Sequence, residues 1–101
     1  MGIPTRERRA GERYIPHLRI YVSGFPESPF GIEWMRFEKG SPVDPLVQQV
    51  PHLAFEVDNL DRELARNDFE ILTPPGAPSS GVRVAMIMHD GAPVELMEFI
   101  R

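Results

Sequence analysis

The sequence contains no cysteine. A disulfide framework, a thiolate metal cage and a cysteine nucleophile are therefore excluded, and this absence is typical of a protein from a reducing compartment. Any bound metal must use nitrogen and oxygen ligands.

Long apolar runs and an excess of basic residues are also absent. No stretch approaches the ~20 apolar residues that a membrane span needs, and residues 1–13 are too polar for a signal sequence. The net charge is −4, with both signs interspersed, so no basic stripe is available to follow a phosphate backbone. We therefore expect a soluble, cytoplasmic protein that binds neither membranes nor nucleic acid.

An internal duplication is the main feature that is present. LRIYV at residues 18–22 and IEWMRF at 32–37 are mirrored by VRVAM at 82–86 and VELMEF at 94–99. Each pair alternates as β-strands do, with a turn-rich connection between its two members. The chain of 101 residues is therefore expected to form a single domain, residues 1–101, that contains the same β-hairpin twice.

The stretch between the hairpins predicts a strand followed by a helix. In residues 53–57 the alternation places Leu53, Phe55 and Val57 on a buried face, with His52 and Glu56 on the other. Asp58 is the expected cap of the short helix that follows, and 69–72 is the next strand. Residues 73–81 are rich in proline, serine and glycine and predict a loop, either a lid over a site or a surface connection.

One glutamate lies at the same place in each copy of the duplicated unit. Glu33 shares its face with Met35, and Glu95 shares its face with Met97, because residues two apart in a strand point the same way. A carboxylate on such an apolar face needs a partner, a proton or a cation. Two of them at equivalent positions suggest a shared cation.

These residues resemble the vicinal oxygen chelate superfamily, which includes glyoxalase, bleomycin-resistance and extradiol dioxygenase proteins. The matching stretches are HLAFEVDNL at residues 52–60, GVRVAM at 81–86 and DGAPVELME at 90–98. The resemblance implies an α+β fold of paired βαβββ modules whose mixed sheets curl around a cleft. Residues 51–101 match a complete module. Residues 1–50 match a degenerate first module whose helix is reduced or lost.

The resemblance also implies a divalent metal site. Its ligands would be Glu33, His52 and Glu95, with Glu33 or Glu95 as the catalytic base. Zn²⁺, Ni²⁺, Mn²⁺ and Fe²⁺ all suit such a set. Aligning Gly2 with Ala54 places the counterpart of His52, the fourth ligand of the family, one position before Met1. Three alternatives follow: the start of the sequence is late, the site has three protein ligands, or the site is no longer catalytic.

The leading functional interpretation is a glyoxalase-like protein that binds a divalent metal and a small molecule with vicinal carbonyl or hydroxyl oxygens. As an enzyme it would be a lyase or isomerase of the lactoylglutathione lyase type, acting through a metal-stabilised enediolate. The alternative is a non-catalytic binding or sequestering protein of the bleomycin-resistance type, without metal. A third interpretation is a structural dimer without a ligand, and a homodimer is expected in any case because a short chain has sheet edges to cover.

Three residue types have a plainer interpretation beside the functional one. His52 is either a metal ligand or a histidine at the edge of a strand. The arginine-rich residues 6–13 are a solvated loop, or Arg6, Arg8 or Arg9 contacts a phosphate or another anion. Trp34 belongs either to the core or to the wall of a ligand pocket.

Overall fold

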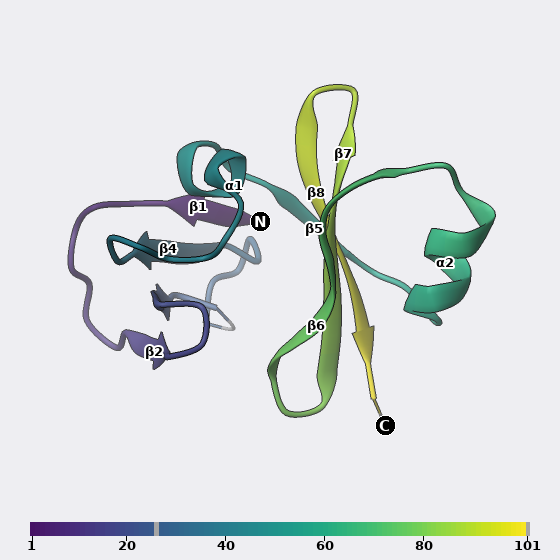
Figure 1. The fold of residues 1–101 in the computed structure, drawn as a ribbon. Coiled ribbons are helices and arrows are strands. Elements are labelled where there is room, and N and C mark those ends of the chain that lie inside the picture. Colours follow the sequence, from purple (N-terminus) through teal and green to yellow (C-terminus); the bar gives the residue numbers. More distant parts are fainter. Residues whose placement is uncertain (26, 101) are drawn as a thin grey trace. The chain divides into compact units, whose positions relative to one another are not determined.

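The computed structural model describes residues 1–25 and 27–100, and the chain divides into two compact units, Met1–His52 and Leu53–Arg101. Each unit contains one four-stranded mixed sheet (Figure 1). The predicted α+β class is confirmed.

The first unit is built on the strand order β1-β4-β3-β2, with β1 parallel to β4 and the other pairs antiparallel. A short helix, α1, follows the last strand and is capped by the side chain of Asp44, which accepts a hydrogen bond from the amide of Leu46 at 2.9 Å. The elements are β1 (Gly2–Pro4), β2 (Arg13–Ile15), β3 (Ile20–Ser23), β4 (Glu33–Phe37) and α1 (Pro45–Gln49).

The second unit repeats this topology, with strand order β5-β8-β7-β6 and β5 parallel to β8. Gly2 pairs with Glu33 in the first sheet, and Ala54 pairs with Glu95 in the second. The predicted duplication is therefore confirmed at the level of strand register. The elements are β5 (Leu53–Glu56), α2 (Leu60–Arg66), β6 (Glu70–Ser79), β7 (Val82–His89) and β8 (Ala92–Phe99).

The helix marks the difference between the two units. In the second unit α2 connects the first two strands, whereas residues 5–12 of the first unit contain no helix. The prediction of a first module without its helix is confirmed. The cause is visible in the sequence, because residues 6–13 have no apolar positions at helical spacing.

Each unit has its own small apolar cluster. In the first unit Ile15, Ile20 and Val22 are buried against Met35 and Phe37. In the second, α2 inserts Leu60, which is 0% exposed, against a buried set on β7 and β8: Ala85, Ile87 and Leu96. Full burial of one such side chain stabilises the folded state by about 1.5–3 kcal/mol.

The predicted burial of β5 is wrong for two residues. Leu53 and Phe55 are 47% and 51% exposed, while Val57 packs against the core cluster. The physical reason lies in the position of β5, because it is an edge strand while α2 packs against β7 and β8.

The predicted loop at residues 73–81 is also wrong, because β6 continues to Ser79 and pairs with β7. The strand accommodates its prolines in two ways. It lies at the edge of the sheet, where a missing amide donor is tolerated, and its pairing shifts register at three places.

Smaller differences concern the ends of elements. The helix cap is Asn59 rather than Asp58, and its side chain accepts a hydrogen bond from the amide of Arg62 at 3.0 Å. Strand β2 begins inside the predicted loop 6–13 and pairs with β3, where the rings of Tyr14 and Tyr21 are 4.6 Å apart. The turn of the last hairpin is confirmed: Asp90 and Gly91 both have positive φ, at 49° and 84°.

Candidate functional site

His52 lies against the first strand of the first unit. The backbones of His52 and Gly2 exchange two hydrogen bonds of 2.9 Å, which form an isolated bridge. The imidazole covers Gly2 so closely that a Cβ atom at that position would lie 2.3 Å from Cε1 of His52. Only glycine allows the ring to occupy this place.

The environment of His52 keeps its ring neutral. The residue is 4% exposed, and its Nδ1 atom is buried without a hydrogen-bond partner. Burial, and secondarily the N-terminal ammonium group, lower the pKa of His52 to about 4. The imidazole is therefore uncharged at neutral pH, which is the form that binds metals.

Glu33 is the second predicted ligand in this unit. It lies on β4, and its register partner is the same Gly2 that bridges to His52. Burial raises the pKa of Glu33, while Arg13 and the N-terminal ammonium group act in the opposite direction. The first unit thus places two predicted donors beside one glycine.

Glu95 is the third predicted ligand and belongs to the second unit. It lies on β8 between Ala54 of β5 and Met86 of β7, and it is partly buried. Its register position is equivalent to that of Glu33. Across residues 1–25 and 27–100, no three His, Cys, Asp or Glu side chains form a group that could hold a metal.

The residues themselves are chemically suited to a divalent metal. The buried Nδ1 of His52 has no partner, and Glu33 is held in surroundings that disfavour a bare negative charge. A cation would relieve both conditions, because imidazole nitrogen and carboxylate oxygen are ordinary ligands of Zn²⁺ and similar ions.

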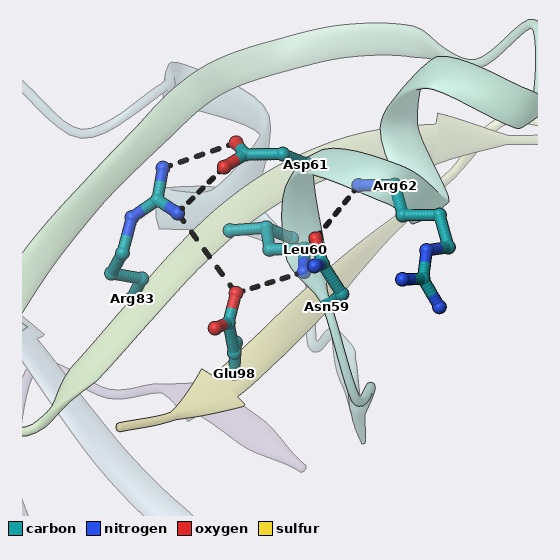
Figure 2. Close-up of polar contacts among 6 residues, drawn as sticks. All are labelled: Asn59, Leu60, Asp61, Arg62, Arg83 and Glu98. Atoms are coloured by element: carbon teal, nitrogen blue, oxygen red, sulfur yellow. Dashed lines mark hydrogen bonds and ion pairs between the residues drawn. The ribbon is translucent and has the colours of Figure 1, made fainter. Parts of the chain in front are cut away.

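Glu98 has a structural role instead. Figure 2 shows its carboxylate accepting a hydrogen bond from the amide of Leu60 at 2.9 Å, at the start of α2. Arg83 lies 3.9 Å from the same carboxylate and binds Asp61 of α2 through two contacts of 3.0 and 3.2 Å. These contacts fasten the helix to the sheet, as expected for a side chain on the face opposite Glu95.

The first unit also contains an open cavity of about 340 Å³ that was not predicted from the sequence. Its lining residues are Arg8, Arg9, Ala10, Ser23, Gly24 and Trp34. Two sequence features pointed to it. Anion contact was the alternative interpretation of the arginines in residues 6–13, and the wall of a ligand pocket was the alternative interpretation of Trp34. Their meeting depends on the pairing of strands and could not be read from their spacing.

Comparison with known proteins bears on the fold. The chain matches no family model and no curated protein. A solved structure of a hypothetical protein from Bacillus halodurans C-125 is 18% identical, with a TM-score of 0.72 over 99% of this chain and 91% of that one. A glyoxalase family protein from Bacillus cereus is 19% identical, with a TM-score of 0.48 over 81% of this chain and 62% of that one.

The protein is an α+β protein of two repeated four-stranded mixed sheets, and the first unit lacks the helix that connects the first two strands of the second. None of the helices in its described residues is long and apolar enough to cross a membrane.

Proposed function

We propose that this protein binds a divalent metal together with a small molecule that carries vicinal carbonyl or hydroxyl oxygens, as a glyoxalase-like lyase or isomerase. The observation that carries the proposal is His52, a buried neutral imidazole with an unpartnered Nδ1, bridged to the glycine that also pairs with Glu33. Glu95 is included in the proposed site because its register position in the second sheet is equivalent to that of Glu33 in the first.

Each residue has a distinct part in this proposal. His52 and the two glutamates would hold the metal, and the metal when bound would polarise the oxygens of the substrate. Glu33 is also suited to move a proton, because burial raises its pKa toward the range useful in general acid–base catalysis.

A non-catalytic binding protein is the second candidate function. That role would be favoured if Glu33 and Glu95 were neutralised by Arg36 or Arg83. Arg36 binds Glu12 at 2.8 and 2.9 Å, and Arg83 binds Asp61 at 3.0 Å and lies 3.9 Å from Glu98. Arg13 acts to lower the pKa of Glu33, so it is a cation close to that carboxylate, and this observation supports the metal-free candidate.

Elemental analysis of dialysed protein tests the metal. The wild type should retain about one metal ion per chain, and Glu33→Gln, His52→Ala and Glu95→Gln should each lose it. Matched controls are Glu27→Gln and His89→Ala, both at exposed positions, which should retain the metal. Metal-loaded wild type is then assayed on vicinal carbonyl compounds.

Two results would contradict the proposal. Folded wild-type protein that retains no metal after exposure to Zn²⁺, Ni²⁺, Mn²⁺ or Fe²⁺ would reject metal binding and leave the binding-protein function. Retention of metal by Glu95→Gln, with loss in the other two variants, would remove Glu95 from the ligand set.

A further inference from the structure

The cavity of the first unit lies on the face of the sheet opposite Glu33. Ser23 of β3 pairs with Trp34 of β4, whereas their neighbours Val22 and Met35 point into the core. Adjacent strand residues face opposite sides, so Ser23 and Trp34 are on the outer face. The cavity is therefore separate from the proposed metal ligands.

The cavity is formed where a helix is missing. Because Glu33 and Glu95 are equivalent, Trp34 and Ser23 correspond to Leu96 and Ala85 of the second unit. There, Leu60 of α2 packs on these two residues and is fully buried. In the first unit residues 8–10 take the place of the helix and leave about 340 Å³ open.

The lining carries two arginine side chains, Arg8 and Arg9. The guanidinium group of Arg9 lies over the ring of Trp34, 4.4 Å from its centre. The nearby carboxylate is Glu12: its two oxygens accept hydrogen bonds from Arg36, and it also interacts with the charge of Arg8 and with the backbone of Arg9. None of the ion pairs among residues 1–25 and 27–100 includes Arg8 or Arg9.

Ser23 adds an unpaired hydroxyl group to this wall. The residue is 7% exposed, and its Oγ atom is buried without a hydrogen-bond partner. Buried hydroxyl groups are normally paired, so an acceptor oxygen inside the cavity would supply what is missing here. Gly24, next in the chain, admits the indole at close range, since a Cβ there would lie 3.1 Å from Cδ1 of Trp34.

We infer that this cavity binds the phosphate group of a small phosphorylated molecule. Two guanidinium groups and a hydroxyl offer more donors than the two oxygens of a carboxylate can accept, whereas a phosphate monoester has three terminal oxygens and close to two negative charges. Trp34 and Ala10 line the rest of the cavity and suit a small organic group.

Trp34 makes this inference directly measurable, because it is the single tryptophan of the chain. Metal-free protein in a chelator is titrated with inorganic phosphate while chloride holds the ionic strength constant. Indole fluorescence should change and saturate. Arg8→Gln should raise the phosphate concentration at half-saturation by about tenfold or more, since it removes a charge-assisted contact. Ser23→Ala should raise this concentration to a smaller extent.

Arg62→Gln is the matched control, because it removes the same charge from an exposed position on α2. Phosphate titration of this variant should equal that of the wild type. His52→Ala should also bind phosphate as the wild type does, so this result is independent of the metal proposal. A strictly linear response in the wild type, or equal weakening in Arg62→Gln and Arg8→Gln, would overturn the site. Equal half-saturation by acetate would overturn the choice of phosphate.

Discussion

At the scale of single residues, His52 is the most constrained side chain. Its ring occupies space that exists only because residue 2 is glycine, and its Nδ1 has no partner. The charged groups that influence its titration include the N-terminal ammonium group, which lowers its pKa further. A histidine in such a place makes folding dependent on pH.

The sign of this dependence follows from the lowered pKa. The folded pKa of His52 is about 4, against an ordinary value of 6.5, so between these limits the unfolded chain binds the extra proton. The stabilising contribution is present above pH 6.5 and is lost as the pH falls toward 4. Metal-free wild type should lose about 2–3 kcal/mol more between pH 7.5 and 4.5 than His52→Gln does.

Denaturant unfolding followed by Trp34 fluorescence measures this difference in the first unit. Glu33 affects the pH dependence of stability with the opposite sign, because its pKa is raised. The comparison between protein with His52 and the His52→Gln variant is therefore repeated in a Glu33→Gln background. His89→Gln, at an exposed position, should show the same change in the free energy of unfolding with pH as the wild type. Identical slopes for wild type and His52→Gln would show that the buried imidazole is not the cause.

At the scale of elements, the two units solve the same problem differently. Both cover the sheet face that lies opposite Glu33 in the first unit and opposite Glu95 in the second. In the second unit α2 is attached by Glu98 and Arg83 (Figure 2), which occupy the positions of Arg36 and Tyr21 in the first. In the first unit Arg36 lies 4.1 Å from the centre of the Tyr21 ring and binds Glu12 of the covering loop. A charged contact thus secures either a helix or a loop.

We predict that Glu98→Ala loosens α2. The substitution removes the acceptor of the Leu60 amide at the helix start and leaves Arg83 with Asp61 alone as its described partner, at a cost of about 1–2 kcal/mol. Hydrogen exchange of residues 60–66 should accelerate. Glu98→Gln keeps an acceptor oxygen and should have a smaller effect.

Glu70→Ala is the control for this experiment, because Glu70 is exposed at the start of β6. Hydrogen-exchange rates of α2 in the Glu70→Ala variant should match those of the wild type. If Glu98→Ala leaves protection of the helix unchanged, the packing of Leu60 alone would be sufficient to hold α2.

At the scale of the whole molecule, each unit has its own core and leaves strands uncovered. The edge strand β5 exposes Leu53 and Phe55. An exposed apolar edge is typical of a surface that pairs with another chain. The homodimer expected from the sequence therefore remains a prediction with a defined surface to test.

Sedimentation velocity over a range of protein concentrations should show a dimer for the wild type. Phe55→Lys should shift the equilibrium to monomer, because a charge would be buried at the contact. Phe30→Lys is the control: Phe30 is 82% exposed in a turn of the first unit, and its substitution should leave association unchanged. A monomeric wild type would contradict the dimer, and a dimeric Phe55→Lys would place its interface elsewhere.

Patterns in the sequence were sufficient for the repeated topology and for the equivalence of Glu33 and Glu95. Alternation along a strand and the Asp90-Gly91 turn are local properties, because each depends only on residues that are close together in the sequence. The missing first helix was equally visible, since residues 6–13 lack an apolar stripe.

Tertiary structure alone decided which surfaces are covered. Leu53 and Phe55 alternate like buried residues but remain exposed, because β5 is an edge strand and α2 packs against β7 and β8. The prolines of β6 became part of a strand because they lie at a sheet edge. His52 and Gly2 meet across fifty residues, and Arg8, Ser23 and Trp34 meet around a space left by a helix. Such contacts depend on strand pairing and on the volume of neighbouring elements, which no local pattern contains.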